Sequence, residues 1–321
     1  MKNLSFVAAF ALVGLAFVSC EKEVTGIDNT YSVPNAVLLT SFYANQLSNN
    51  TQSFTVDATT GGMITGAHGA TVTIAPGSLF HNSTTVVTGN VDITLVEIYD
   101  RGTMVTMNKA TRGYLPNDSL STLVSGGEYY LKISQNGQDV LAPTGVAVTL
   151  PADSTGGPDG SMAVFNGVFD GDDLNWDLEP ATNVDVIQDT AGGTHYLIMD
   201  QSWGWTNVDR FYSFAGPKTL LRAQMPTGFT PANCELFLTY DGEPTALASL
   251  DVFENGYFSE HYGQIPIGLA VHFIAVAIID GELYYAIQAA TIEEDHIEQI
   301  ASSQFHATTQ AELVEIINDL P

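Results

Sequence analysis

Residues 271–289 read VHFIAVAIIDGELYYAIQA, and this stretch indicates the fold class of the chain. Val271–Ile279 is apolar except for one histidine, and it is rich in the β-branched and aromatic residues that favour strands. Asp280-Gly281 follows, a dipeptide typical of the two-residue turn in a β-hairpin. Leu283–Ala289 supplies the returning strand. The stretch therefore predicts an antiparallel hairpin.

The same strand pattern continues along the body of the chain, where the dominant period is two residues. Further strands are predicted at Thr71–Ala75, Val86–Ile98, Tyr129–Ser134, Val146–Leu150, Ala163–Phe169, Tyr196–Met199 and Leu236–Tyr240. Helical signals gather near the end, where Thr291-Ile-Glu-Glu and Thr309-Gln-Ala-Glu both have the form of a capping box. Many short strands at this spacing favour antiparallel β-sandwiches.

A domain boundary is expected at 151–160, where proline, glycine and small polar residues crowd together between two strands. It would separate a first β-sandwich domain at 36–151 from a second β-rich domain at 160–321 that ends in helices. Both lengths fall within the usual range for a domain. The expected fold is thus mainly β, with two antiparallel β-sandwich-like domains and a short C-terminal helical cap.

The first twenty residues have the pattern of an export signal. Lys2 precedes an apolar run from Leu4 to Val18 that is too short for a stable membrane-spanning helix, and Ser19-Cys20 ends it. Ala16–Cys20 resembles a bacterial lipobox. That resemblance implies a signal peptide at 1–19, acyl chains such as palmitate on Cys20, and a flexible tether over 20–35. The alternative is an ordinary secretory peptide cleaved nearby, with Cys20 incidental.

The charge balance restricts the partners. The chain has 36 acidic and 9 basic residues, a net charge of -27. A polyanion without a basic patch binds nucleic acid or an anionic membrane surface poorly, so any attachment to the membrane is expected to be covalent or hydrophobic, through the lipid anchor. The short string Glu21-Lys22-Glu23 resembles the export tag of surface lipoproteins of the Bacteroidota. This implies the outer membrane and exposure at the cell surface.

A family resemblance rests on several strings. Gly61-Gly62-Met63-Ile64-Thr65, followed by Gly69–Leu79 with its Pro76-Gly77 turn, resembles the opening of a ZU5-type β-sandwich. Gly204–Phe211, which reads GWTNVDRF, resembles a string in the second half of uncharacterised Bacteroidota lipoproteins that carry such a module. The resemblance implies the fold. It implies little about function, although ZU5 modules elsewhere mediate protein contacts.

Signatures of common enzymes are absent from the sequence: it has no Gly-x-Ser-x-Gly elbow, no His-Glu-x-x-His and no phosphate-binding loop. Cys234 alternates with the polar side of a predicted strand, so we expect a buried, inert thiol. An acidic loop offers oxygen ligands for calcium from Asp170, Asp172, Asp173, Asn175 and Asp177. The alternative for this loop is a solvated acidic turn.

One further set of residues is a candidate for binding glycans, and another for covalent glycosylation. Exposed rings of Trp203, Trp205 and Tyr212 would form a platform for stacking on sugars, with Asn207 and Asp209 as hydrogen-bonding groups. The alternative is core packing around Arg210, neutralised by Asp209. Ser119, Ser154 and Thr190 each follow an aspartate in a string that resembles the O-glycosylation acceptor of Bacteroidota.

These observations favour a non-catalytic binding or structural module, anchored by lipid, that contacts an envelope protein or an extracellular glycan. Two alternatives remain at this point. One is a carboxylate-dependent glycan hydrolase, because acidic residues are the main catalytic groups in supply. The other is a spacer that holds a partner away from the membrane.

Overall fold

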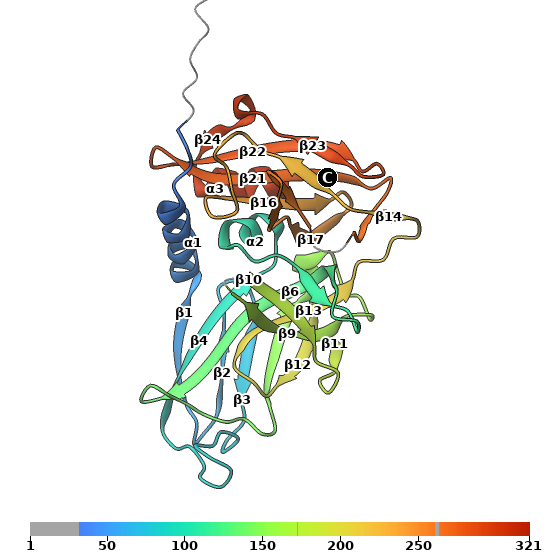
Figure 1. The fold of residues 1–321 in the computed structure, drawn as a ribbon. Helices are drawn as coiled ribbons and strands as arrows, with labels where there is room; N and C mark the ends of the chain where they lie inside the picture. Colours follow the sequence, from blue (N-terminus) through green and yellow to red (C-terminus); the bar gives the residue numbers. More distant parts are fainter. Residues whose placement is uncertain (1–31, 172, 261–262) are drawn as a thin grey trace, which may run out of the picture. The chain divides into compact units, whose positions relative to one another are not determined.

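The hairpin predicted at 271–289 forms β21 (Ala270–Ile279) and β22 (Glu282–Thr291) in the computed structural model, which describes residues 32–171, 173–260 and 263–321 (Figure 1). Asp280 and Gly281 have φ values of 52° and 90°, and both are positive, as a type I′ turn requires. The other predicted strands form, although the one predicted at Val86–Ile98 begins only at Asn90, and the fold is mainly β. The predicted signal peptide at 1–19, Cys20 and the predicted tether up to Tyr31 lie outside the described residues.

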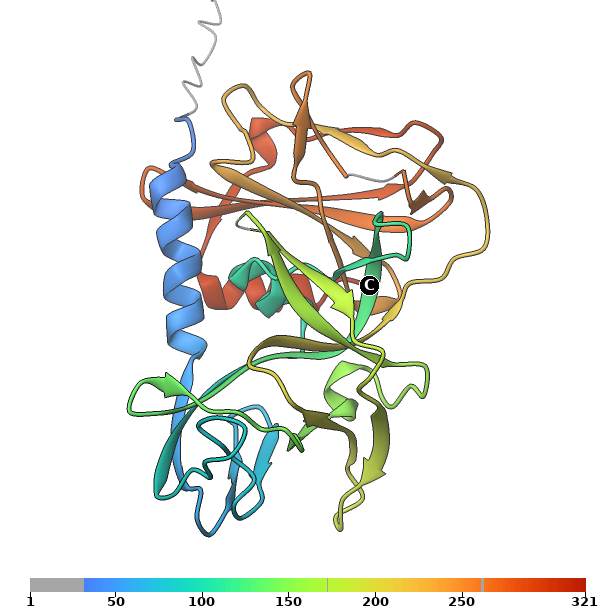
Figure 2. The same cartoon turned by 60° about the horizontal axis from the view of Figure 1, so that its bottom comes forward.

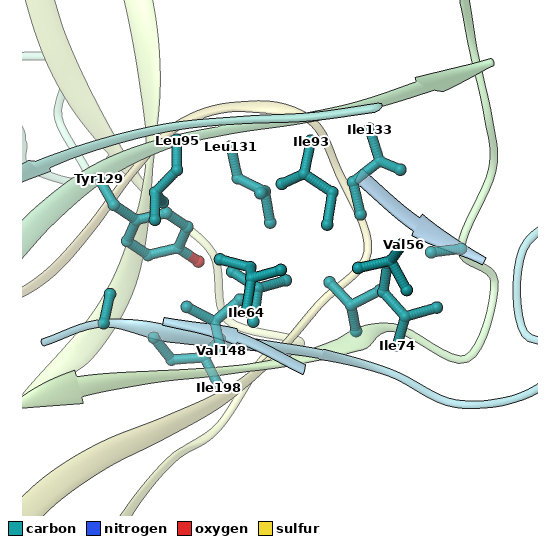
Figure 3. Packing of buried hydrophobic residues seen from close by; sticks show 14 of the residues in the cluster. Val56, Ile64, Ile74, Ile93, Leu95, Tyr129, Leu131, Ile133, Val148 and Ile198 are labelled. Atoms are coloured by element: carbon teal, nitrogen blue, oxygen red, sulfur yellow. The ribbon is translucent and has the colours of Figure 1, made fainter. Parts of the chain in front are cut away.

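The first core lies between two sheet layers. One layer consists of β1 (Gln52–Asp57), β4 (Asn90–Ile98), β6 (Leu120–Gln135) and β7 (Gln138–Asp139), and the other of β2 (Gly62–Thr65), β3 (Thr71–Ile74), β8 (Val146–Pro151), β12 (Thr194–Asp200) and β11 (Val184–Gln188). Figure 3 shows Ile93 and Leu131 directed at Ile64 and Val148 across this core. Burying an aliphatic side chain of this size, rather than leaving it exposed, stabilises the folded state by about 1.5–3 kcal/mol.

The expected boundary at 151–160 does not separate two sets of strands. Strand β8 lies before it and pairs with β12, which lies after it. In the same way β6 pairs with β13 (Gly204–Phe211). The predicted domain 36–151 therefore lacks strands that complete its own sheets, and residues 32–321 form one compact unit. The boundary segment carries a short 3₁₀ turn, η1 (Ala152–Thr155). The boundary prediction failed because a loop within one unit can have the same composition as a linker between two domains.

A second core packs around three helices. Its strands are β13, β9 (Ala163–Asp170), β10 (Asp173–Leu178) and β5 (Arg112–Tyr114), together with β17 (Glu243–Ser249), β16 (Cys234–Tyr240), β21, β22 and β24 (His306–Thr308). The helices are α1 (Ala36–Asn50), α2 (Arg101–Met107) and α3 (Gln310–Asn318). In Figures 1 and 2, α1 runs along one side and α2 lies beside α3. β17 pairs with β6, which joins the sheets of both cores.

The helical predictions were right at one position and wrong at another. Helix α3 begins at the capping box predicted from Thr309, whose side chain accepts from the backbone N–H of Glu312. The second box, at Thr291, forms no helix. Thr291 is still paired with Ala270 as the last residue of β22, and Asp295 adopts a left-handed φ of 54° before the next strand. Strand pairing on both sides leaves too few residues for a helix.

The remaining strands are short. β18 (Val252–Glu254), β19 (Tyr257–Ser259), β15 (Arg222–Gln224) and β23 (Ile297–Gln299) form a four-stranded sheet, β14 (Lys218–Thr219) pairs with β20 (Ile265–Pro266), and η2 spans Ser302–Gln304. Within the described ranges, each helix falls short of the length and apolar character needed to cross a bilayer.

Candidate functional site

A groove of about 600 Å³ lies beside α1, between the end of α2 and the start of β16. The titratable side chains that line it are Tyr43 from α1, Lys109 after α2, Asp173 at the start of β10, Glu235 from β16 and Asp251 after β17. We call this the α1 groove. Helix α1 forms there because Asn35 caps it, its side chain accepting from the Leu38 N–H at 3.0 Å. Leu39, Phe42, Tyr43 and Leu47 then fall on one face and pack against the second core.

Glu235 is the central acid of the α1 groove. It is only partly buried, because alternation in β16 directs its neighbours Cys234 and Leu236 into the core instead. Burial, and secondarily the carboxylates of Asp173 and Asp251, raise the pKa of Glu235 to about 7, while Arg112 opposes the shift. A carboxyl group that is half protonated near neutral pH can both donate and accept hydrogen bonds.

Two potential donors accompany this acid. The hydroxyl of Tyr43 is buried without a hydrogen-bond partner among the described residues, and burial followed by the charge of Glu235 raises its pKa. The ammonium of Lys109 lies 5.3 Å from the ring centroid of Trp205, a cation–π distance. Desolvation lowers the pKa of Lys109, although Glu128 and Asp173 act against it. The groove therefore combines acceptors and donors beside the apolar side of a helix.

The predicted calcium ligands do not converge. Asp170 and Asp173 face each other across the β9–β10 hairpin, whereas Asp177 pairs with Asn166 at its other end. Asp173 and Asp177 are four residues apart on one strand, about 13 Å, and calcium needs its oxygens within about 2.6 Å. Asn175 is buried between them, and Asp172 lies outside the described residues. The four described side chains thus do not form one calcium site.

The predicted aromatic platform is wrong. Trp205, Asn207 and Asp209 are buried, so a glycan cannot reach them. Trp203 packs on the first core and donates from its ring N–H to the carbonyl of Val140, whereas Trp205 belongs to the second core. Tyr212 is half-buried and contacts Tyr240 edge to face. The rings do not share one exposed face, because β13 lies between the two cores and is covered on both sides.

Core packing, the alternative for this segment, is correct, but the charge partner of Arg210 is different. Arg210 pairs with Asp159 at 2.8 Å and lies 3.4 Å from Glu243. Asp209 accepts instead from the side-chain amide of Asn207 at 2.7 Å. Successive residues of a strand point to opposite faces, so Asp209 and Arg210 cannot meet.

The remaining sequence candidates lie on turns or in the core. Ser154 and Thr190 are exposed, and Ser119 is half-buried, with its hydroxyl donating to the Asn117 side chain at 2.8 Å. Cys234 is fully buried and unbridged, and burial raises the pKa of its thiol, as expected for an inert cysteine.

Of the residues in the α1 groove, only Asp173 was a candidate from the sequence. A signal for α1 was present in the spacing of Leu39, Phe42 and Tyr43, and a signal for Glu235 in a lone acid between apolar residues of a strand. Neither signal says that the two elements meet. Comparison with protein-family models and with curated proteins finds no match to this chain.

Proposed function

We propose that this chain is a lipid-anchored protein of the outer membrane, exposed at the cell surface, that binds an extracellular glycan in the α1 groove without catalysis. The observation that carries the proposal is the pairing of acceptors and donors around Glu235 in one groove. Sugars present alternating hydroxyls and apolar ring faces, which such a mixed lining fits. An envelope protein is the less suited partner, because protein interfaces usually bury about 800 Å² on each side.

Within the observed mainly β fold, we propose two more specific architectures. We infer that the layers around the first core form a ZU5-like β-sandwich, and that the sheets around the three helices form a second sandwich-like unit. The Gly61-Gly62 opening supports the first inference, since Gly61 has a φ of 69° immediately before β2. A Cβ there would lie 2.5 Å from the carbonyl oxygen of Ile74, so this turn requires glycine.

Glu235→Gln is expected to weaken glycan binding about tenfold, because a neutral amide replaces a carboxyl group that accepts from hydroxyls. In the wild type, affinity should also change between pH 6 and 8 as Glu235 ionises, and in the variant this dependence should disappear. A glycan array with the purified full-length protein in detergent identifies a ligand, and calorimetry measures both effects. Glu282→Gln, an exposed acid at the β21–β22 turn, is the charge-matched control. Absence of any glycan ligand would contradict the proposal.

A second candidate function, glycan hydrolysis, is favoured by one specific observation. Glu235 has the raised pKa expected of a general acid and lies near two other carboxylates, Asp173 and Asp251. In that case the wild type releases new reducing ends from the bound glycan, and Glu235→Gln abolishes the release. If binding is the function, no product forms with either protein.

Anchoring through Cys20 is tested separately. Cys20→Ser is expected to move most of the protein from the membrane fraction to the soluble fraction, because acyl chains supply about 0.8 kcal/mol for each buried CH₂ group. Labelled fatty acid should attach to the wild type alone, and protease added to intact cells should digest the wild type if it faces outward. A variant that stays in the membrane fraction, or a wild type without label, would disprove the anchor.

A further inference from the structure

One face of the four-stranded sheet β18–β19–β15–β23 is partly exposed and carries polar side chains beside Val252 and Ile297. Phe258 and Ala223 are fully buried on its other side. Cross-strand register places a second set of alternating residues together on the exposed side: Arg222 and Gln224 of β15, Glu254 of β18, Tyr257 of β19 and Gln299 of β23. We call these five residues the Arg222 platform. Neighbouring strands lie about 4.8 Å apart, so these side chains form one continuous surface.

Arg222 lacks the partner that such a group normally has. Its Nε is buried without a hydrogen-bond partner, and no ion pair joins it to a carboxylate within the described part of the chain. This is unusual where 36 acidic residues surround 9 basic ones. The guanidinium carbon lies 6.0 Å from the ring centroid of Tyr257, and both residues line a hollow of about 490 Å³. The two terminal nitrogens of the guanidinium are not among the buried unpaired atoms, so a ligand in the hollow can supply acceptors to them.

Two acids also line this hollow and limit what it can take. Glu260 accepts from the backbone N–H of Gly263 at 2.9 Å, so its carboxylate is held by the turn. Glu254 is exposed at the rim. A ligand must therefore present a carboxylate to Arg222 and hydroxyl donors to Glu254. A phosphate group carries more negative charge than a single carboxylate, so Glu254 at the rim repels it more strongly.

The rest of the platform suits a sugar ring. The side chain of Tyr257 offers an aromatic face for stacking. Gln224 lies two residues from Arg222 on β15, and Gln299 of β23 lies opposite Gln224. Within the described ranges, no hydrogen bond joins either side-chain amide to another residue. Amides of this kind both donate to and accept from hydroxyl groups. Long-range repulsion by the net charge of -27 is screened beyond about 8 Å at physiological salt, so the local contacts decide.

We propose that the Arg222 platform binds a carboxylate-bearing sugar of the uronic acid class, with the carboxylate on Arg222 and the ring against Tyr257. The platform and the α1 groove share no residue. Their variants are separate, so failure of one proposal leaves the other standing.

The test is calorimetry of the full-length protein with tetragalacturonate, in a buffer containing EDTA, against the methyl ester of the same oligosaccharide. The free acid is expected to bind at least tenfold more tightly than the neutral ester. Arg222→Gln should weaken binding of the acid about 10- to 100-fold, because a charge-assisted, two-pronged contact is lost. Tyr257→Ala should weaken both ligands.

Lys132→Gln is the matched control, since it removes one exposed cation from a different sheet. Lys132 lies on β6 and pairs with Asp139 at 3.0 Å. It should bind tetragalacturonate as the wild type does, and thermal melting should show that all variants fold. The proposal is overturned by any of three results: no binding of the free acid, equal affinity for the ester, or wild-type affinity in Arg222→Gln.

Discussion

Replacing Gly102 by alanine is expected to lower the free energy of unfolding by about 3 kcal/mol or more, one of the two largest effects anticipated for this chain. Gly102 lies in α2, where that helix crosses α3. A Cβ at this position would lie 2.5 Å from the carbonyl oxygen and 2.7 Å from the Cα of Val314. Both are backbone atoms, so no side-chain rotation relieves the overlap and the helices must separate.

Separation of α2 and α3 would also break the polar contacts that join them. The backbone N–H of Gly102 donates to the side chain of Asn318 at 2.8 Å, and the buried guanidinium of Arg101 donates to the carbonyls of Leu320 and Pro321. Hydrogen bonds to a charged group are worth about 1.5–3 kcal/mol each, and Arg101 would keep its charge in the core. The loss of unfolding free energy in Gly102→Ala should therefore be larger than the loss caused by steric overlap alone.

The measurement is thermal unfolding, where a loss of this size lowers the melting temperature by about 5 °C or more for a unit of this length. Gly160→Ala is the matched control, because an added Cβ there meets no atom within 4 Å. It should be neutral or slightly stabilising, since alanine restricts the unfolded chain. A Gly102→Ala protein that melts within a degree of the wild type would show that α2 and α3 do not pack this closely.

Local features of the fold were predictable from the sequence, and long-range pairing was not. The β21–β22 hairpin and the cap of α3 depend on neighbouring residues, so the patterns at Asp280-Gly281 and Thr309 were sufficient. Strand β6 shows the opposite case. It spans Leu120–Gln135 and joins both cores, passing through Gly126 where a Cβ would lie 2.8 Å from the Tyr196 ring. Composition at 151–160 contains no information about such a partner.

The candidate sites show the same division. Burial of Cys234 followed from strand alternation alone. The α1 groove brings together Tyr43, Lys109 and Glu235, which are far apart in the chain, and the charges that raise the pKa of Glu235 come from other strands and loops. The aromatic prediction failed for a related reason. Period two places Trp203 and Trp205 on one face of an ideal strand, but only the assembled sheets show that β13 is covered on both sides.

The second large effect concerns two carboxyl groups buried between the cores. Glu128 and Asp209 are both fully buried, and neither oxygen of Glu128 has a hydrogen-bond partner within the described chain. Asn207, opposite Glu128 on β13, donates to Asp209 and accepts from the hydroxyl of Ser125 at 2.8 Å. Burial raises the pKa of Glu128 well above its usual value, with the charge of Asp209 adding and that of Lys109 opposing. Burial also raises the pKa of Asp209.

These raised pKa values fix the sign of the pH dependence. Both acids bind protons more tightly in the folded state than in the unfolded chain, so their contribution to stability is complete below about pH 4, the unfolded value. It is lost as pH rises through the window up to the folded pKa values. Between pH 5 and pH 8 the wild type should therefore lose stability. For each acid, one unit of difference between its pKa in the folded state and its pKa in the unfolded state corresponds to about 1.4 kcal/mol.

Glu128→Gln removes one of these two titrations while preserving shape, so between pH 5 and pH 8 it should lose less stability than the wild type, by on the order of 1 kcal/mol. Urea unfolding at both pH values gives this difference directly. Glu282→Gln makes the same change in net charge at an exposed site and should not alter the slope, which separates the buried pair from general repulsion within an acidic protein. Parallel pH profiles for Glu128→Gln and the wild type would mean that the folded protein holds Glu128 ionised, with a cation or ordered water beside it. In that case Lys109, the cation whose charge already lowers the pKa of Glu128, is the first group to replace.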